Sequence, residues 1–96
     1  MPPRHHWTRE DDLVVLYVYR FGTENLGCTL EDVAQSRSIP FGSFNMRLSN
    51  FAAIDGKRGL NHYAGISKEV YDQHYKIDEI TLHRLAFPNS RKKDVG

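Results

Sequence analysis

The chain has 96 residues, of which 40% are hydrophobic and 26% are charged, and its formal net charge is +1. This length fits a single domain with a modest core, and the near-average composition excludes a chain that is disordered throughout. Cys28 is the only cysteine, which excludes an intramolecular disulfide and a cysteine-based zinc cluster. Because no apolar run approaches transmembrane length and no signal-peptide pattern follows Met1, we expect a cytoplasmic protein that does not enter a membrane.

Basic and acidic residues are unevenly distributed along the chain. Four basic residues oppose one acid between positions 36 and 66, and three oppose one acid between positions 88 and 96. The acids gather instead at Glu10-Asp11-Asp12 and Glu31-Asp32, where the capping of helix starts explains them. This distribution fits a protein that binds DNA with one face, and it fits a solvated surface with capped helices equally well.

We expect residues 1–6 to form a flexible lead-in to the first predicted helix. Thr8 is a hydroxyl N-cap, and Asp11 three residues later completes a shortened capping box. Apolar residues then recur at helical spacing until Gly22, which is a natural helix stop. The sequence therefore predicts a helix over residues 9–21.

The same N-terminal pattern recurs at Thr29 and Asp32, and it predicts a short helix over residues 30–36. Cys28 precedes this cap, in the position from which an apolar side chain packs back on the helix, here on Val33. We therefore expect Cys28 to lie on the core side and not to act as a nucleophile.

The third predicted helix covers residues 40–51. Pro40 fits its first turn, because the missing N–H of proline is harmless there. An apolar stripe then recurs at spacings of three, four and three residues, formed by Phe41, Phe44, Leu48 and Phe51. The opposite, outer side of this helix is polar, and we expect it to expose Ser43, Asn45, Met46, Arg47, Ser49 and Asn50.

An ordered loop is expected over residues 52–66, followed by two further helices. Ser67 is a candidate N-cap for a helix over residues 68–75, and Asp78 is a candidate N-cap for a last helix over residues 79–87. Because β-branched residues occur near the start of the last segment, a strand is an alternative there. The residues expected to face inward in the last helix are Leu82, Leu85 and Ala86.

These elements predict an all-α domain over residues 7–87, followed by a basic flexible tail over residues 88–96. The architecture is a trihelical helix-turn-helix bundle with one or two extra C-terminal helices, because a short capped helix, a tight break near Ser38 and a longer helix follow one another.

A helix-turn-helix places its second helix in the major groove of double-stranded DNA, where arginine can bind guanine and asparagine can bind adenine. The modest net charge indicates few phosphate contacts per chain, which suits a homodimer on a two-fold site. The candidates for contacts to base edges are Asn45, Arg47 and Asn50, those for phosphates are Ser38, Ser43, Lys57 and Arg58, and Arg37 is a further candidate for DNA contact.

Two other classes of function compete with DNA binding. Any three-helix bundle has a third helix with a polar face, so a protein-interaction module that docks a partner protein through this face, or through Tyr71 and Tyr75, is the alternative. Catalysis is not expected, because the serine, cysteine and histidine residues show no catalytic order. No metal or cofactor is expected either, since the histidines lack ligand spacing, and His74 is interpreted as a partly buried helix residue.

The segment Trp7-Thr8-Arg9-Glu10-Asp11 resembles the start of a Myb/SANT-type trihelical domain, a family whose third helix contacts DNA. A longer likeness, to the N-terminal helical domain of some bacterial HNH-family endonucleases, implies a helix-turn-helix role for residues 37–51. No nuclease domain follows, so the resemblance implies no cleavage; it implies a small regulator or the specificity module of a restriction-type system. The longer likeness is carried by Trp7-Thr8, Leu30 to Val33, Arg37-Ser38, Ser43, Met46-Arg47-Leu48, Asn50-Phe51, Asp55, Gly59-Leu60, Ser67 and Val70-Tyr71.

Overall fold

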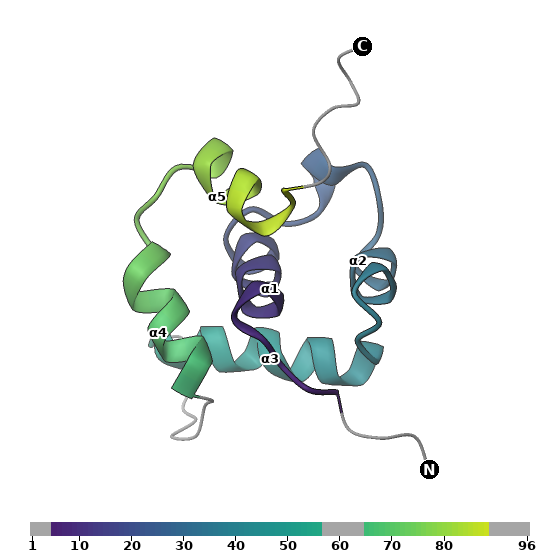
Figure 1. The fold of residues 1–96 in the computed structure, drawn as a ribbon, viewed down its shortest axis with the longest axis horizontal. Coiled ribbons are helices and arrows are strands. Elements are labelled where there is room, and N and C mark those ends of the chain that lie inside the picture. Colours follow the sequence, from purple (N-terminus) through teal and green to yellow (C-terminus); the bar gives the residue numbers. More distant parts are fainter. Residues whose placement is uncertain (1–4, 57–64, 89–96) are drawn as a thin grey trace.

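The computed structural model describes residues 5–56 and 65–88 of the chain. Over these ranges it contains five α-helices and one short 3-10 turn, and no strand (Figure 1). None of these helices is long and apolar enough to span a bilayer. The all-α prediction is confirmed, and the last described segment is a helix. The elements are α1 (Arg9–Phe21), the 3-10 turn (Glu24–Leu26), α2 (Leu30–Ser36), α3 (Phe41–Ile54), α4 (Gly65–His74) and α5 (Glu79–Ala86).

Helix α1 lies at the centre of the fold and packs against α3, α4 and α5. Figure 1 shows it nearly end-on, with α3 crossing below it, α4 on the left and α2 on the right. Residues 11–18 of α1 are all buried. This explains the continuous apolar run from Leu13 to Val18, because a helix that is covered on several sides has no solvent-facing stripe to keep polar.

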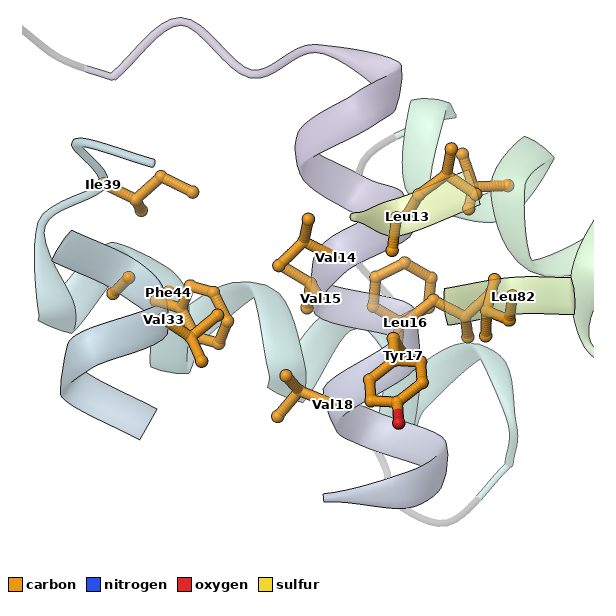
Figure 2. Packing of buried hydrophobic residues seen from close by; sticks show 14 residues of the cluster. Leu13, Val14, Val15, Leu16, Tyr17, Val18, Val33, Ile39, Phe44 and Leu82 are labelled. Carbon is orange, nitrogen blue, oxygen red and sulfur yellow. The ribbon is translucent and has the colours of Figure 1, made fainter. Parts of the chain in front are cut away.

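Buried side chains pack against α1 from two sides (Figure 2). Val33, Ile39 and Phe44 lie together on one side, and Leu82 of α5 lies on the other. Each of the four is at most 3% exposed. Full burial of an apolar side chain of this size stabilises a fold by about 1.5–3 kcal/mol, so these contacts hold α3 and α5 to the central helix and α2 to α3.

The helices begin at the caps that the sequence predicts. The hydroxyls of Thr8 and Thr29 accept the backbone N–H of Asp11 and Asp32, and each carboxylate in turn accepts the backbone N–H of its threonine. Asp78 caps α5 by accepting the backbone N–H three residues further on. The predicted bounds of α1 and α2 are confirmed, because the capping chemistry fixes both starts.

The connection between α2 and α3 is a Schellman turn. The N–H of Ile39 donates to the carbonyl of Ala34, and the N–H of Ser38 donates to the carbonyl of Gln35, both at 2.9 Å. Ser38 has a φ of 59°, the left-handed conformation that this motif requires at that position. Since Ile39 is only 3% exposed, the turn is anchored in the core and fixes the direction in which α3 leaves α2.

Three expectations for the later helices are wrong. Helix α3 continues to Ile54 instead of ending at residue 51. Helix α4 begins at Gly65, so Ser67 is not an N-cap but a buried residue of the first turn. Leu85 is 43% exposed, because the face of α5 that meets α1 is formed by residues one helical turn apart, Leu82 and Ala86.

Candidate functional site

Arg47 does not lie on the outer face of α3, as the sequence analysis expected, but in the interior. Its Nε donates to Oδ1 of Asp12 at 2.8 Å, and its Nη2 donates to Oδ2 of the same carboxylate at 2.9 Å. The guanidinium also lies 4.2 Å from the centre of the Trp7 ring, and Arg47 is 9% exposed. This guanidinium fork is therefore occupied within the protein and is not presented to a guanine base.

Asp12 connects three helices through one carboxylate. It belongs to α1, it is fully buried, and besides Arg47 of α3 it accepts the hydroxyl of Ser67 of α4 at 3.0 Å. The opposite charges of Asp12 and Arg47 compensate each other, and Ser67 donates a further hydrogen bond to the carboxylate. Both buried ions therefore have the partners that offset their loss of water. These contacts fix the orientation of α3 and α4 on α1.

Asp11, the neighbour of Asp12, connects the N-terminal segment and the helix-turn-helix. It accepts hydrogen bonds from the Nε of Arg37 and from His5, each at 2.8 Å, and from the backbone N–H of Thr8. Burial opposes the charge of Asp11, but the bonds from His5, Arg37 and Thr8 outweigh it and hold the pKa of this carboxyl below its usual value. Arg37 remains half-buried at the end of α2 with its charge opposed by a carboxylate.

The outer face of α3 is neutral. Asn45 is exposed, and within the described part of the chain its amide has no hydrogen-bond partner. Beside it, Met46 is 68% exposed. Phe41 is 40% exposed, so its predicted place in the inner apolar stripe is wrong: it lies in the first turn of α3, where the helix is not covered on that side. Ser43 and Asn50 are half-buried, and together with Trp7, Pro40, Gly42, Met46 and Arg47 they line a hollow along this helix.

The remaining predicted DNA contacts fall in different places. Ser38 is exposed on the turn before α3, close in sequence to the helix start. Lys57 and Arg58 lie outside the described residues. The structure thus brings Ser38, Ser43 and Asn45 to the first turns of α3 and their approach, and it removes Arg47 from that surface.

The described residues carry a net negative charge. They contain seven lysines and arginines against eleven aspartates and glutamates, a formal charge of −4, whereas the whole chain has a charge of +1. Four of the seven cations contact a carboxylate. A surface of this kind offers little attraction to a polyanion, so any affinity for DNA must draw on the basic residues of the other segments.

The buried ion pair was not predicted, because charged side chains are expected at the surface. The signal was present: Arg47 is three residues after Phe44 and four before Phe51, which are both fully buried, so helical spacing places it on the inner face. Asp12 likewise directly precedes the apolar run of α1. Helical periodicity therefore predicts that both Arg47 and Asp12 are buried.

A second polar cluster, also missed, lies where α3 ends. Asp55 accepts the hydroxyl of Tyr19 at 2.8 Å and the hydroxyl of Tyr71. Burial, then the bond to this carboxylate, raises the pKa of each tyrosine to about 12. The cluster joins α1, α3 and α4, and Tyr71 also stacks on Tyr75 at 5.0 Å between ring centres.

The histidines and the cysteine have structural surroundings. His74 is half-buried, and its Nδ1 lies 2.9 Å from the carbonyl oxygen of Val70, as expected for a helix residue. Cys28 is half-buried and packs against the core, and burial together with the charge of Asp32 raises the pKa of its thiol. Within residues 5–56 and 65–88, no group of three or more His, Cys, Asp or Glu side chains could hold a metal ion.

Comparison with known proteins adds no relative. No family model matches the chain, and neither the curated proteins nor the solved structures contain a match. The resemblances to the Myb/SANT-type domain and to the N-terminal domain of HNH-family endonucleases therefore stay predictions.

Proposed function

We propose that this chain is a DNA-binding module without catalytic activity, in which α2 and α3 form a helix-turn-helix and α3 enters the major groove. The observation that supports this most directly is the division of α3 into two faces. Its inner face is fixed by Phe44, Arg47 and Phe51, all buried, while its outer face presents Asn45 without an intramolecular partner among the described residues. A helix that is rigidly held from behind and polar in front is what contact with base edges requires.

The turn supports the same proposal. The Schellman geometry at Ser38 and the buried anchor Ile39 define the angle between the two helices without a long loop. Arg37, at the end of α2, is bound to Asp11 of α1, so the helix pair is also bound to the body of the domain. This rigidity keeps the outer residues of α3 in one arrangement and lowers the entropic cost of binding.

The charge distribution determines how such binding would be driven. Because the described residues have a net charge of −4, we assign most phosphate contacts to the basic residues that the sequence places elsewhere, at Lys57-Arg58 and within residues 88–96. In this proposal α3 supplies base contacts, and those basic segments supply the salt-dependent attraction.

The test is fluorescence anisotropy of a labelled random-sequence duplex, titrated with the protein at low and at moderate salt. We expect binding in the micromolar range that weakens steeply as salt is added, because counterions are released from the duplex. The variant Asn45→Asp places a negative charge on the exposed face of α3 and should weaken binding. The matched control is Gln73→Glu, the same chemical change at an exposed position on α4, which should bind as the unmodified chain does.

Docking of a protein partner on the same face is a second candidate. One specific observation favours it: the exposed row of α3 contains Phe41 and Met46 and no cation. An apolar interface of this kind would keep its affinity as ionic strength rises. A photo-crosslinking residue in place of Met46, used in the host cell, distinguishes the two functions, since the covalent product contains either DNA or protein.

A further inference from the structure

We infer that the outer face of α3 selects A·T base pairs over G·C base pairs. This inference rests on the proposed DNA-binding function and specifies the sequences that the same surface would bind. Two observations on α3 support it. The arginine that could bind guanine is buried, and the side chains that remain exposed match adenine and thymine.

The group that would recognise guanine is absent from the outer face. Guanine is bound in the major groove by two donors of one arginine, or by a lysine. Arg47 is the only charged residue of α3. Its Nε and Nη2 both donate to Asp12, and Trp7 covers one face of the guanidinium. To free this guanidinium, the protein would have to leave the Asp12 carboxylate buried without its counter-charge. The free-energy cost of an unpaired buried charge strongly opposes such a rearrangement.

The groups that remain exposed match adenine and thymine. The amide of asparagine can donate from Nδ2 to N7 of adenine while its Oδ1 accepts from the N6 amino group of the same base. Asn45 is exposed and has no partner among the described residues. Phe41 lies one helical turn before Asn45, Met46 follows it directly, and both are exposed. Apolar side chains in this position contact the C5-methyl group of thymine, which is the partner of adenine in the same base pair.

The experiment compares the affinity of the protein for two duplexes of equal length at low salt. One is rich in A·T pairs, with adenine and thymine in irregular order along each strand, and the other is rich in G·C pairs. A single asparagine–adenine pair gives a preference of about 5- to 100-fold for the A·T-rich duplex. Replacing thymine by uracil, which lacks the methyl group, should reduce this preference, and so should replacing adenine by 7-deazaadenine, which lacks N7. Mixed order avoids the narrow minor groove of A-tracts, which attracts cations for another reason.

Two variants assign the preference to α3. Asn45→Ala should reduce the preference to the part that the thymine methyl contacts supply, because it removes the adenine-binding amide at an exposed helix position where alanine is well tolerated. Met46→Gln should discriminate less between thymine and uracil than the unmodified chain does, because it removes one of the two apolar side chains that would contact the methyl group. The control Gln73→Ala, on the exposed face of α4, should keep the full preference.

The outcomes separate this inference from the proposed function. Equal affinity of the unmodified chain for both duplexes would overturn the A·T preference and leave DNA binding intact. An undiminished preference in Asn45→Ala that also survives the replacement of thymine by uracil would overturn it as well, because the selectivity would then come from DNA shape. No binding to either duplex at low salt would overturn the DNA-binding function itself.

Discussion

Arg47 and Asp12 form the most deeply buried ion pair among the described residues, with side chains that are 10% and 0% exposed. The pair lies between the helix proposed to contact DNA and the central helix of the fold. Because Ser67 donates to the same carboxylate, the position of α4 depends on it as well. The residue that the sequence marked as the leading candidate for base contact is thus a structural residue, and its substitution should affect folding before recognition.

The first prediction concerns this pair. Asp12→Asn leaves the Arg47 guanidinium buried without its counter-charge, and it should lower the free energy of unfolding by about 3–5 kcal/mol. Urea denaturation measures the difference. The matched control is Asp72→Asn, which removes an exposed carboxylate that pairs with Lys68 one turn earlier on α4. That change should cost less than about 0.5 kcal/mol, and equal urea midpoints for the two variants would contradict the prediction.

A companion variant tests whether charge or shape matters at this position. Asp12→Leu combined with Arg47→Met replaces both ions by apolar side chains, and buried pairs replaced in this way are often neutral in stability. We therefore expect the double variant to be more stable than Asp12→Asn alone. The opposite order would show that the hydrogen bonds of the carboxylate to Arg47 and Ser67 are essential for packing α3 and α4.

The second prediction concerns the turn before α3. Ser38 has a positive φ, which costs a residue with a side chain about 1 kcal/mol relative to glycine. Ser38→Gly should therefore raise the free energy of unfolding, and Ser38→Val should lower it, because a β-branched residue is poorly tolerated there. Ser36→Gly serves as the control with the opposite sign, since residue 36 is helical and glycine weakens a helix.

The third prediction concerns acid denaturation. Although burial of Asp11 opposes its charge, the hydrogen bonds that it accepts lower its folded-state pKa below the ordinary value of 3.8. The stability that the charged carboxyl contributes is therefore present above pH 3.8 and is lost as the pH falls through the folded-state pKa. Asp11→Asn should show a shallower loss of stability below about pH 4 than the unmodified chain. Glu10→Gln, an exposed change in the same helical turn, should leave that acid dependence unchanged.

The fourth prediction concerns the source of DNA affinity. Substituting Lys57 and Arg58 by alanine should weaken binding to all duplexes similarly. It should also reduce the slope of log K against log salt by about 2, because each substitution removes one cation that neutralises a phosphate. The control is the double variant Lys76→Ala with Arg84→Ala. It also removes two positive charges, one from the connection after α4 and one from α5. If the control variant changes the salt slope as much as the first, the charge of the whole chain and not a defined contact drives binding.

The sequence predicted the helices better than it predicted the direction of individual side chains. The bounds of α1 and α2 follow from Thr8, Thr29 and their capping carboxylates, because these interactions are local. The position of Ser67 could not be found in this way. A serine before a stretch with helical spacing has the appearance of an N-cap, and the hydrogen bond to Asp12, 55 residues earlier in the chain, explains why it is buried inside the helix.

The candidate site was predicted only in part, because the local sequence does not contain the contacts that one helix makes with another. The polar outer face of α3 was evident from the spacing of Phe44 and Phe51, and the exposure of Asn45 follows from it. Arg47 shares that spacing, but a charged side chain is rarely buried without a specific partner. The partner lies on another helix, so the sequence around Arg47 contains no local evidence of it.

Trp7 is the only tryptophan of the chain, and it lies between the His5 ring, at 4.9 Å, and the guanidinium of Arg47, at 4.2 Å. Excitation at the red edge of the absorption band therefore gives a natural fluorescence signal from one place, the junction of the N-terminal segment with the underside of α3. Release of residues 5–8 from this junction would change the emission while the distant contact between α1 and α5 remains closed. The protein thus carries its own optical reporter of this junction, and no dye is needed to observe whether residues 5–8 stay packed against Arg47.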